Sequence, residues 1–294
     1  YIRIDKLDFI QKDFLSSIMD FTFVKIGMDE INYGDAHFRR SDNARAIYNP
    51  FVGNFIMDAF TTEPFAEVTV IHPSGFLGVA GASNGRLNQN VAGNMDEGIS
   101  FYGKLGYDKE MNEDLRLRLT GSIYTSSTKS TRDYLYNGDR AGARYYGVLE
   151  ANNSGGDFDP RFNPGFSSMT AFQVNPFVKF QGLEFFGIFE SSSNNVDSVG
   201  GSFTQLGAEL LYRFGGKEQF YVGGRYNSVS GKASDNGSDI EISRINGGAG
   251  WYLTRNTLVK AEYVTSSYDG DGYVGSKFEG LTWDGVVLEA TIGF

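Results

Sequence analysis

The stretch Asp114-Leu-Arg-Leu-Arg-Leu-Thr-Gly-Ser-Ile-Tyr124 decides how this chain folds. Its residues fall into two strictly alternating sets, which are Leu115, Leu117, Leu119, Gly121 and Ile123 against Arg116, Arg118, Thr120, Ser122 and Tyr124. Successive side chains of a β-strand point to opposite faces of the sheet. A period of two therefore predicts a strand with one apolar face and one wet face.

The same alternation recurs along the whole chain, and no stretch sustains a helical period over three turns. We expect about thirteen strands, over residues 1–9, 19–28, 64–71, 76–83, 99–107, 114–125, 170–180, 183–191, 203–214, 218–228, 240–253, 257–266 and 282–294. Glycine and β-branched residues are common in these segments, and both residue types disfavour helices. The sequence therefore predicts an all-β protein.

The connections between these strands sort into two kinds that alternate along the chain. The short ones are residues 72–75, 109–113, 181–182, 215–218 and 254–256. The long ones are rich in Gly, Ser, Asn and Asp, and cover 29–63, 84–97, 126–167, 192–201, 229–238 and 267–280. Outer-membrane barrels have short periplasmic turns and long extracellular loops. We therefore expect residues 1–294 to form one transmembrane antiparallel up-and-down β-barrel domain in the outer membrane of a Gram-negative bacterium.

Aromatic residues gather beside the short turns. They are Tyr107, Phe180, Phe214, Phe220, Tyr221, Trp251 and Tyr252. Tyr and Trp favour the membrane–water interface, where the ring and its polar tip are both satisfied. In the alternative interpretation these rings form the core of a soluble β-sandwich, but this explains neither their position nor the sorting of the connections.

The composition agrees with a barrel and excludes several other classes. The mean hydropathy is −0.29 and no long apolar run occurs, which excludes a transmembrane helix but not a barrel, whose strands expose only every second residue to lipid. The net charge of −10 disfavours nucleic acid as a partner. The absence of cysteine removes thiolate chemistry and disulfides. The chain begins at Tyr1 without a signal peptide, so we interpret it as a mature or trimmed chain.

The last strand, from about Val286 onward, alternates Val, Leu, Ala, Ile and finally Phe294 with other residues. This pattern resembles the C-terminal signal that the barrel-assembly machinery recognises in outer-membrane proteins. The resemblance implies this machinery as a partner, in addition to outer-membrane lipid and lipopolysaccharide.

The expected strand number is odd, whereas single-chain bacterial barrels have an even number. Counting back from a periplasmic C-terminus makes the strand at Tyr1 run downward from the outside. We therefore predict about 14 strands, the first of them missing from this sequence or unrecognised, with 12 or 16 as alternatives.

The polar phase of the strands predicts which charged side chains line the lumen. The basic ones are Arg3, Lys25, Lys104, Arg116, Arg118, Lys179, Arg213, Arg225, Arg244 and Lys260. The acidic ones are Asp5, Glu67, Glu184, Glu190, Glu209, Glu262 and Glu289. These groups either line a water-filled pore that favours anions or pair across the wall and support it. Their near balance favours pairing, and the excess of bases is consistent with a mildly anion-favouring lumen.

Two long loops are candidates for a constriction. Residues 29–63 and 126–167 are rich in aromatic residues, and ordering such loops requires apolar burial. The loops either fold into the barrel mouth or pack against an outer-membrane partner or lipopolysaccharide. The constriction candidates are His37, Arg39, Arg40, Arg45, Arg132 and Arg144.

The segment Phe23–Asp35 together with His37-Phe-Arg-Arg40 and Asn49-Pro-Phe-Val-Gly53 resembles porin-like outer-membrane proteins of the Bacteroidota. It is also loosely similar to the strand-to-loop step of phosphate-selective porins. Those porins have more strands and dense lysine or arginine ladders, which this chain lacks. The resemblance therefore implies a porin-like barrel without implying phosphate selectivity.

Enzymatic chemistry is disfavoured because the chain has only two histidines, His37 and His72, to serve a catalytic Ser or Asp. The acidic loop at 268–273 lacks the ligands of an EF-hand and is interpreted as a hairpin tip. We predict no enzyme activity, no cofactor and no metal. The predicted function is a porin-like channel for passive diffusion of small polar or anionic solutes. The alternative is a non-conducting barrel that serves as a structural or docking subunit of an outer-membrane complex.

Overall fold

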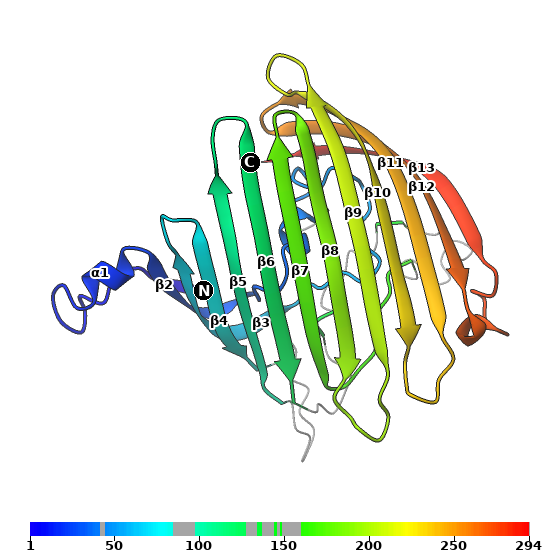
Figure 1. Ribbon diagram of the computed structural model, residues 1–294, viewed down its shortest axis with the longest axis horizontal. Coiled ribbons are helices and arrows are strands. Elements are labelled where there is room, and N and C mark those ends of the chain that lie inside the picture. Colours follow the sequence, from blue (N-terminus) through cyan, green and yellow to red (C-terminus); the bar gives the residue numbers. More distant parts are fainter. Residues whose placement is uncertain are drawn as a thin grey trace.

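The computed structural model describes residues 1–41, 45–84, 98–127, 134–136, 144–145, 148 and 160–293. In this part of the chain thirteen strands form one antiparallel sheet, in which each strand pairs with its neighbours in sequence (Figure 1). The strands are β1 (Ile2–Ile4), β2 (Thr22–Glu30), β3 (Thr62–Ile71), β4 (Phe76–Ser83), β5 (Ser100–Glu110), β6 (Leu115–Ser126), β7 (Met169–Phe180), β8 (Leu183–Asn194), β9 (Ser202–Phe214), β10 (Phe220–Lys232), β11 (Ile240–Thr254), β12 (Thr257–Asp269) and β13 (Thr282–Ile292). The predicted all-β up-and-down fold is confirmed.

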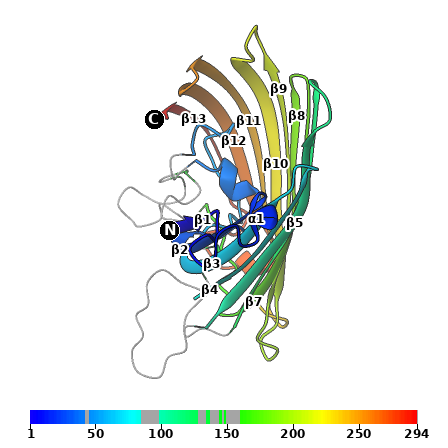
Figure 2. The same ribbon diagram turned by 90° about the vertical axis from the view of Figure 1, so that its left-hand side faces the viewer.

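The sheet curves around an interior that is filled by chain rather than left empty. Figure 2 shows the wall of β5–β10 on one side and the blue β2–β3 connection enclosed by the curved sheet. β1 and β13 are the two edges of the sheet, and within the described residues they do not pair with each other. The fourteenth strand, which we expect because single-chain bacterial barrels have an even number of strands, stays a prediction.

Exposure along each strand is inverted relative to a soluble protein. On β6, Leu119 and Ile123 are 54% and 51% exposed, whereas Thr120 and Ser122 are each 1% exposed. The apolar side chains therefore face outward and the polar ones inward, as on a wall that stands in lipid. No helix in the described residues is long and apolar enough to cross a membrane.

Outward-facing aromatic rings form part of a belt at the short-turn end of the wall. Phe214 stacks on Phe220, and Phe220 stacks on Trp251, each with ring centroids 5.7 Å apart. Two of the aromatics expected at the interface lie elsewhere, since Tyr221 and Tyr252 point into the lumen. The reason is the period of two, which places neighbours such as Phe220 and Tyr221 on opposite faces.

The expected strand over residues 1–9 is wrong beyond Ile4. The chain leaves the sheet after β1, forms the one-turn helix α1 (Ser16–Met19), and returns at Thr22. The N–H of Ile10 donates to the carbonyl of Leu7 at 2.9 Å, which closes a turn inside the expected strand, and further along Asp13 and Leu15 have φ angles of 59° and 53°. One connection at the short-turn end is therefore long.

The last strand ends at Ile292, and Phe294 lies outside the described residues. The described strand alternates as expected, with Val286 and Leu288 exposed by 72% and 75%. Recognition of this strand by the assembly machinery stays a prediction.

Candidate functional site: the loop-filled lumen

The connection between β2 and β3, residues 31–61, folds inward and occupies the lumen; we call it the inner loop. Its described residues include Ile31, Tyr33, Phe51, Ile56 and Met57, each at most 3% exposed. Of the two arrangements expected for this loop, the structure therefore has the one inside the barrel. The short 3₁₀ helix η1 (Ala36–Arg39) lies within the inner loop.

Wall side chains hold the peptide N–H groups of the inner loop. Glu262 on β12 accepts hydrogen bonds from the N–H of Val52 and of Gly53, at 2.6 and 3.2 Å. Asn227 on β10 accepts from the N–H of Ile56 at 2.7 Å. Gln205 on β9 accepts from the N–H of Met57 at 2.9 Å and donates to the carbonyl of the same residue at 2.6 Å. These contacts satisfy backbone groups that would otherwise be buried without partners.

Two basic side chains hold the carbonyl groups of the same segment. Lys260 donates to the carbonyl oxygens of Ala46, Asn49 and Phe51 at 2.8 to 3.0 Å, and also pairs with Glu289 at 2.8 Å. Arg225 donates to the Gly53 carbonyl at 2.7 Å and pairs with Glu209 at 3.4 Å. We call Gln205, Arg225, Asn227, Lys260 and Glu262 together the loop clamp.

Glycines in the wall leave room for rings of the inner loop. A Cβ atom at Gly207 would lie 3.0 Å from the Phe55 ring, and one at Gly248 would lie 3.1 Å from Phe51. The two glycines lie on β9 and β11. The wall and the loop are therefore complementary in shape as well as in hydrogen bonding.

A second anchor holds the start of the inner loop against β5 and β6. The Asp35 carboxylate pairs with Lys104 at 3.0 Å and with Arg118 at 2.8 Å, and it accepts from Thr120 at 2.8 Å. Burial alone would raise the pKa of Asp35, but Lys104 and Arg118 outweigh it and hold this pKa well below its usual range. The loop therefore contacts the wall on both sides of the lumen.

The constriction candidates of the inner loop support its own fold and its contacts with the wall. The buried Arg40 pairs with Asp58 at 2.6 Å, and Arg45 pairs with Glu30. His37 is 2% exposed and its Nδ1 lies 2.8 Å from the carbonyl oxygen of Tyr33. Burial, with the nearby Lys104 and Arg45, lowers the pKa of His37 well below its usual value, so this side chain is neutral.

The β6–β7 connection also contributes to the lumen through its described residues. Tyr136 donates to Glu190 at 2.7 Å, and Tyr145 donates to Glu262 at 2.6 Å. Arg144 pairs with Glu289 at 2.8 Å. Arg132, the last constriction candidate, lies outside the described residues.

A cavity of about 520 Å³ lies at the short-turn end of the lumen; we call it the vestibule. Its lining residues are Asp35, Phe38, Arg39, Tyr48, Arg116, Arg118, Phe177, Glu184, Phe186, Arg213 and Tyr252. Four arginines therefore face two carboxylates. Glu184 pairs with Arg39 at 2.8 Å and with Arg213 at 3.0 Å. Arg116 pairs with Asp108 at 2.8 Å and keeps 44% of its side chain exposed.

Arg39 carries an unpaired donor beside aromatic rings of the vestibule. Its guanidinium lies over Phe186 at 4.5 Å and over Phe177 at 5.8 Å. Its Nη1 atom is buried and has no hydrogen-bond partner among the described residues. Arginine stacked on an aromatic ring is a common way to present a donor to an anion.

The remaining residues predicted to line the pore are paired or covered. Lys25 lies 3.9 Å from Asp29, and Lys179 pairs with Glu218 at 2.8 Å. Arg244 is 1% exposed, lies 5.0 Å from the centre of the Tyr145 ring, and donates to the Pro160 carbonyl at 2.7 Å. Contact of these residues with a solute stays a prediction.

Sequence reasoning missed the uncharged polar residues of the wall. Besides Gln205 and Asn227, they include Asn175, which accepts from the N–H of Asp35 at 2.8 Å, and Asn246, which donates to Glu262 at 3.0 Å. All four lie in the inward phase of their strands and are at most 1% exposed. The sequence did contain a signal for them, because these Asn and Gln residues occupy the same inward-facing positions of the strands as the charged residues.

Comparison with known proteins places this fold among outer-membrane barrels. An anion-selective porin from Comamonas acidovorans superposes with a TM-score of 0.56 at 14% identity, over 94% of this chain and 75% of that one. OprB of Pseudomonas putida has a TM-score of 0.54 at 15% identity, over 93% and 70% of the two chains. The outer-membrane channel DcaP of Acinetobacter baumannii has a TM-score of 0.51 at 12% identity, over 93% and 72%.

The chain matches no protein-family model, and no curated protein matches it in sequence. The structural similarity therefore establishes the class of fold, an outer-membrane β-barrel of the porin type. The resemblance to proteins of the Bacteroidota is not tested by these comparisons and stays a prediction.

Proposed function

We propose that this protein is a porin-like channel in the outer membrane of a Gram-negative bacterium, and that it passes small anionic or polar solutes by diffusion. The observation that carries the proposal is the vestibule, where four arginines face two carboxylates in a cavity of about 520 Å³. Basic side chains on the wall of a pore raise the local concentration of anions. The porin-type fold supports the same proposal.

The inner loop sets the narrowest part of the proposed path. It is held at Asp35 on the β5–β6 side and at the loop clamp on the β9–β12 side. Solutes therefore pass beside a fixed segment of chain, and the arginines of the vestibule meet them at the short-turn end. The proposed channel is narrow for its number of strands.

The alternative is a non-conducting barrel that serves as a structural or docking subunit. The observation in its favour is that most of the predicted lumen charges are covered by the inner loop. Lys104, Glu209, Arg225, Lys260 and Glu262 are each at most 3% exposed.

Conductance of the purified barrel in a planar bilayer separates the two functions. The channel proposal expects stable conductance steps. Across a potassium chloride gradient it also expects a reversal potential whose sign shows that chloride is more permeant than potassium. The protein should first be shown to be folded by the shift of its band on an unheated gel. A silent bilayer with folded protein would overturn the channel proposal and support the alternative.

A further inference from the structure

The connection between β1 and β2, residues 5–21, carries large apolar side chains that no other part of the described chain covers. Phe9 and Ile10 are 73% and 62% exposed, and Leu15 and Ile18 are 45% and 46% exposed. Exposed apolar residues are normal on the strands of a lipid-facing wall, but these residues lie outside the sheet. A group of this kind marks an interaction surface.

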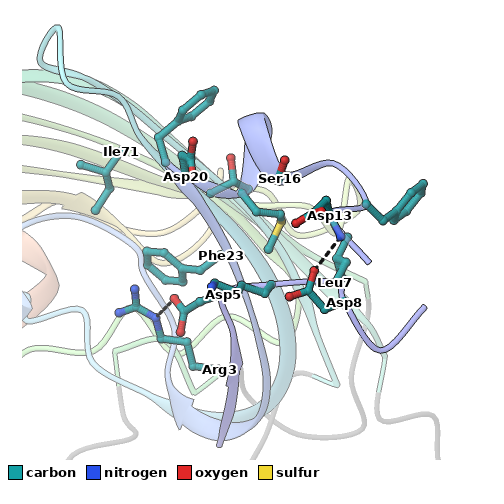
Figure 3. A pocket seen from close by; sticks show the side chains of 14 residues that line it. Arg3, Asp5, Leu7, Asp8, Asp13, Ser16, Asp20, Phe23 and Ile71 are labelled. Carbon is teal, nitrogen blue, oxygen red and sulfur yellow. Dashed lines mark hydrogen bonds and ion pairs between the residues drawn. The ribbon is translucent and has the colours of Figure 1, made fainter. Parts of the chain in front are cut away.

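The most exposed apolar side chains of the segment lie apart from its aspartates. A hollow of about 450 Å³ lies between the segment and the ends of β2 and β3. Asp5, Asp8, Asp13 and Asp20 line this hollow (Figure 3). Phe9, Ile10, Leu15 and Ile18 do not line it. Apolar side chains of the segment, among them Leu7, Phe14 and Met19, line the hollow as well. The four most exposed apolar side chains of the segment therefore lie away from the aspartates, while its other apolar side chains pack at the hollow.

The segment leaves the wall at the level of the short turns. Phe21 accepts a backbone hydrogen bond from Ile71, and its ring packs edge-on against His72 of the β3–β4 turn at 5.1 Å. Directly after this turn Phe76 faces outward and packs against Tyr107 at 5.3 Å, within the aromatic belt. The segment is thus continuous with the lipid-facing surface at the membrane interface.

The segment runs sideways from the wall, as expected for a chain that lies along the membrane interface. In Figure 1 the chain around α1 extends sideways beyond β2, away from the sheet, and does not continue the direction of the strands. A connection that only crossed the periplasmic end of the barrel would have no need to project beyond the wall. The lateral course carries the apolar side chains over the membrane next to the barrel.

We propose that residues 5–21 form an interfacial segment that rests on the leaflet at the short-turn side of the barrel. Phe9, Ile10, Leu15 and Ile18 enter the boundary between headgroups and acyl chains, and the aspartates face water. The segment carries two lysines and four aspartates, a net charge of −2, so it has no attraction for anionic lipid. Its occupant is therefore a zwitterionic phospholipid. This proposal rests on the membrane location of the barrel and not on conduction.

Spin labels test the proposal directly, because the chain has no cysteine and each new cysteine is unique. Phe9→Cys and Ile18→Cys are labelled and reconstituted in vesicles of phosphatidylcholine and phosphatidylethanolamine. Leu119→Cys, on the lipid-facing wall, and Lys217→Cys, in the exposed β9–β10 turn, are the matched controls. Collisions of each label with oxygen, which concentrates in lipid, are compared with collisions with a water-soluble nickel complex.

The expected result is that the labels at Phe9 and Ile18 favour oxygen over nickel, as the Leu119 label does, and that the Lys217 label favours nickel. Labels at Phe9 and Ile18 that behave like the Lys217 label would overturn the proposal, because water would then cover the segment. Labels that neither reagent reaches would also overturn it, because protein would then cover the segment. Folding of each variant is checked by the band shift on an unheated gel.

Discussion

The loop clamp and the vestibule are built from the same kind of residue in the same phase of neighbouring strands, yet they differ in what their charges contact. In the loop clamp, Lys260 and Glu262 are at most 2% exposed and bind peptide groups of the inner loop. In the vestibule, Arg116 and Arg118 bind carboxylates and keep 44% and 21% of their side chains exposed. The inward phase of a strand therefore defines a face of the wall, and the inner loop divides this face into a covered part and a solvent-exposed part.

The two regions also differ in the energy that each contact represents. A buried group that loses its partner has no water to replace it, whereas an exposed ion pair exchanges its partner for solvent at little cost. We therefore expect substitutions in the loop clamp to affect stability and substitutions in the vestibule to affect selectivity.

The largest expected effect is that of Lys260→Met. It removes the donor to three carbonyl groups, two of them buried, and one partner of the partly buried Glu289. We expect a loss of about 3–5 kcal/mol in the free energy of unfolding, measured by denaturant titration of the barrel in lipid. Lys179→Met is the control, since its pair with Glu218 is partly exposed and should contribute less than about 1 kcal/mol. Equal losses in the two variants would remove the distinction between the regions.

A smaller effect is expected for Asn227→Ala, which leaves the N–H of Ile56 without its acceptor. The cost of one unsatisfied buried donor is about 1–3 kcal/mol. We expect faster hydrogen exchange in the inner loop and added noise in single-channel recordings. Tyr226→Phe, on the outward face of the same strand, should change neither measurement. Unchanged exchange at residues 53–58 in the first variant would contradict a clamp on this segment.

Acid should loosen the inner loop through His37. The lowered pKa of His37 means that the packed loop holds this side chain neutral, while an exposed histidine binds a proton below about pH 6.5. Stability is therefore constant above that pH and falls below it, by at most about 1.4 kcal/mol per pH unit for one group. Asp35 adds to the loss only near pH 4 and below, because the carboxylate of the unfolded chain takes up a proton there while the folded chain still holds Asp35 ionised.

Denaturant titrations at pH 7 and pH 5 measure this effect. His37→Gln keeps a polar side chain but cannot take up the proton, so the difference between the two pH values should shrink in this variant. The groups that face His37 are Asp35, Lys104 and Arg45, and Asp35 stays ionised over this range. A pH difference of the same size in both proteins would show that His37 is not responsible.

The smallest effect on stability, and the one that tests the vestibule, is expected for Arg116→Gln. Its ion pair with Asp108 is exposed enough that the free energy of unfolding should change by less than about 1 kcal/mol. The preference for chloride over potassium should nevertheless fall, as measured by the reversal potential across a salt gradient. Arg3→Gln, an exposed arginine at the sheet edge, serves as the control. The same shift in both variants would point to overall charge and not to the vestibule.

The strands were predictable because one rule, alternation, controls them. Every expected strand is present, and the β6 pattern from Leu115 to Tyr124 predicts which side of the wall each residue occupies. The exception is the first strand. There Lys6 and Asp8 alternate with Leu7 and Phe9, but in the phase opposite to that of Ile2 and Ile4, because Asp5 and Lys6 are both polar. The break of phase at Asp5 and Lys6 marks the end of the strand, and each short alternating run alone is compatible with either structure.

The loop clamp could not be predicted in the same way. Its contacts join residues 46–57 to side chains of β9, β10 and β12, at separations of about 150 to 210 positions. The side chains bind peptide groups, which every residue carries, so the loop has no sequence pattern that identifies its partners. The alternation predicts that Arg116, Arg118 and Arg213 face inward. It does not predict that they stay exposed while other inward charges are buried, because that depends on where the inner loop lies.

The recognition of peptide groups by Glu262, Asn227 and Gln205 has a consequence for how this barrel tolerates change. Apart from the rings of Phe51 and Phe55, which fit against wall glycines, the contacts with N–H and carbonyl groups depend on the number of residues in the segment and not on its side chains. Side chains of the inner loop that do not contact the wall can therefore be exchanged without loss of the scaffold, whereas one residue inserted between Gly53 and Ile56 would displace the peptide groups on one side of the insertion from their partners. Substitutions in the inner loop would thus change the selectivity of the proposed channel, whereas insertions or deletions would change how the loop fills the lumen.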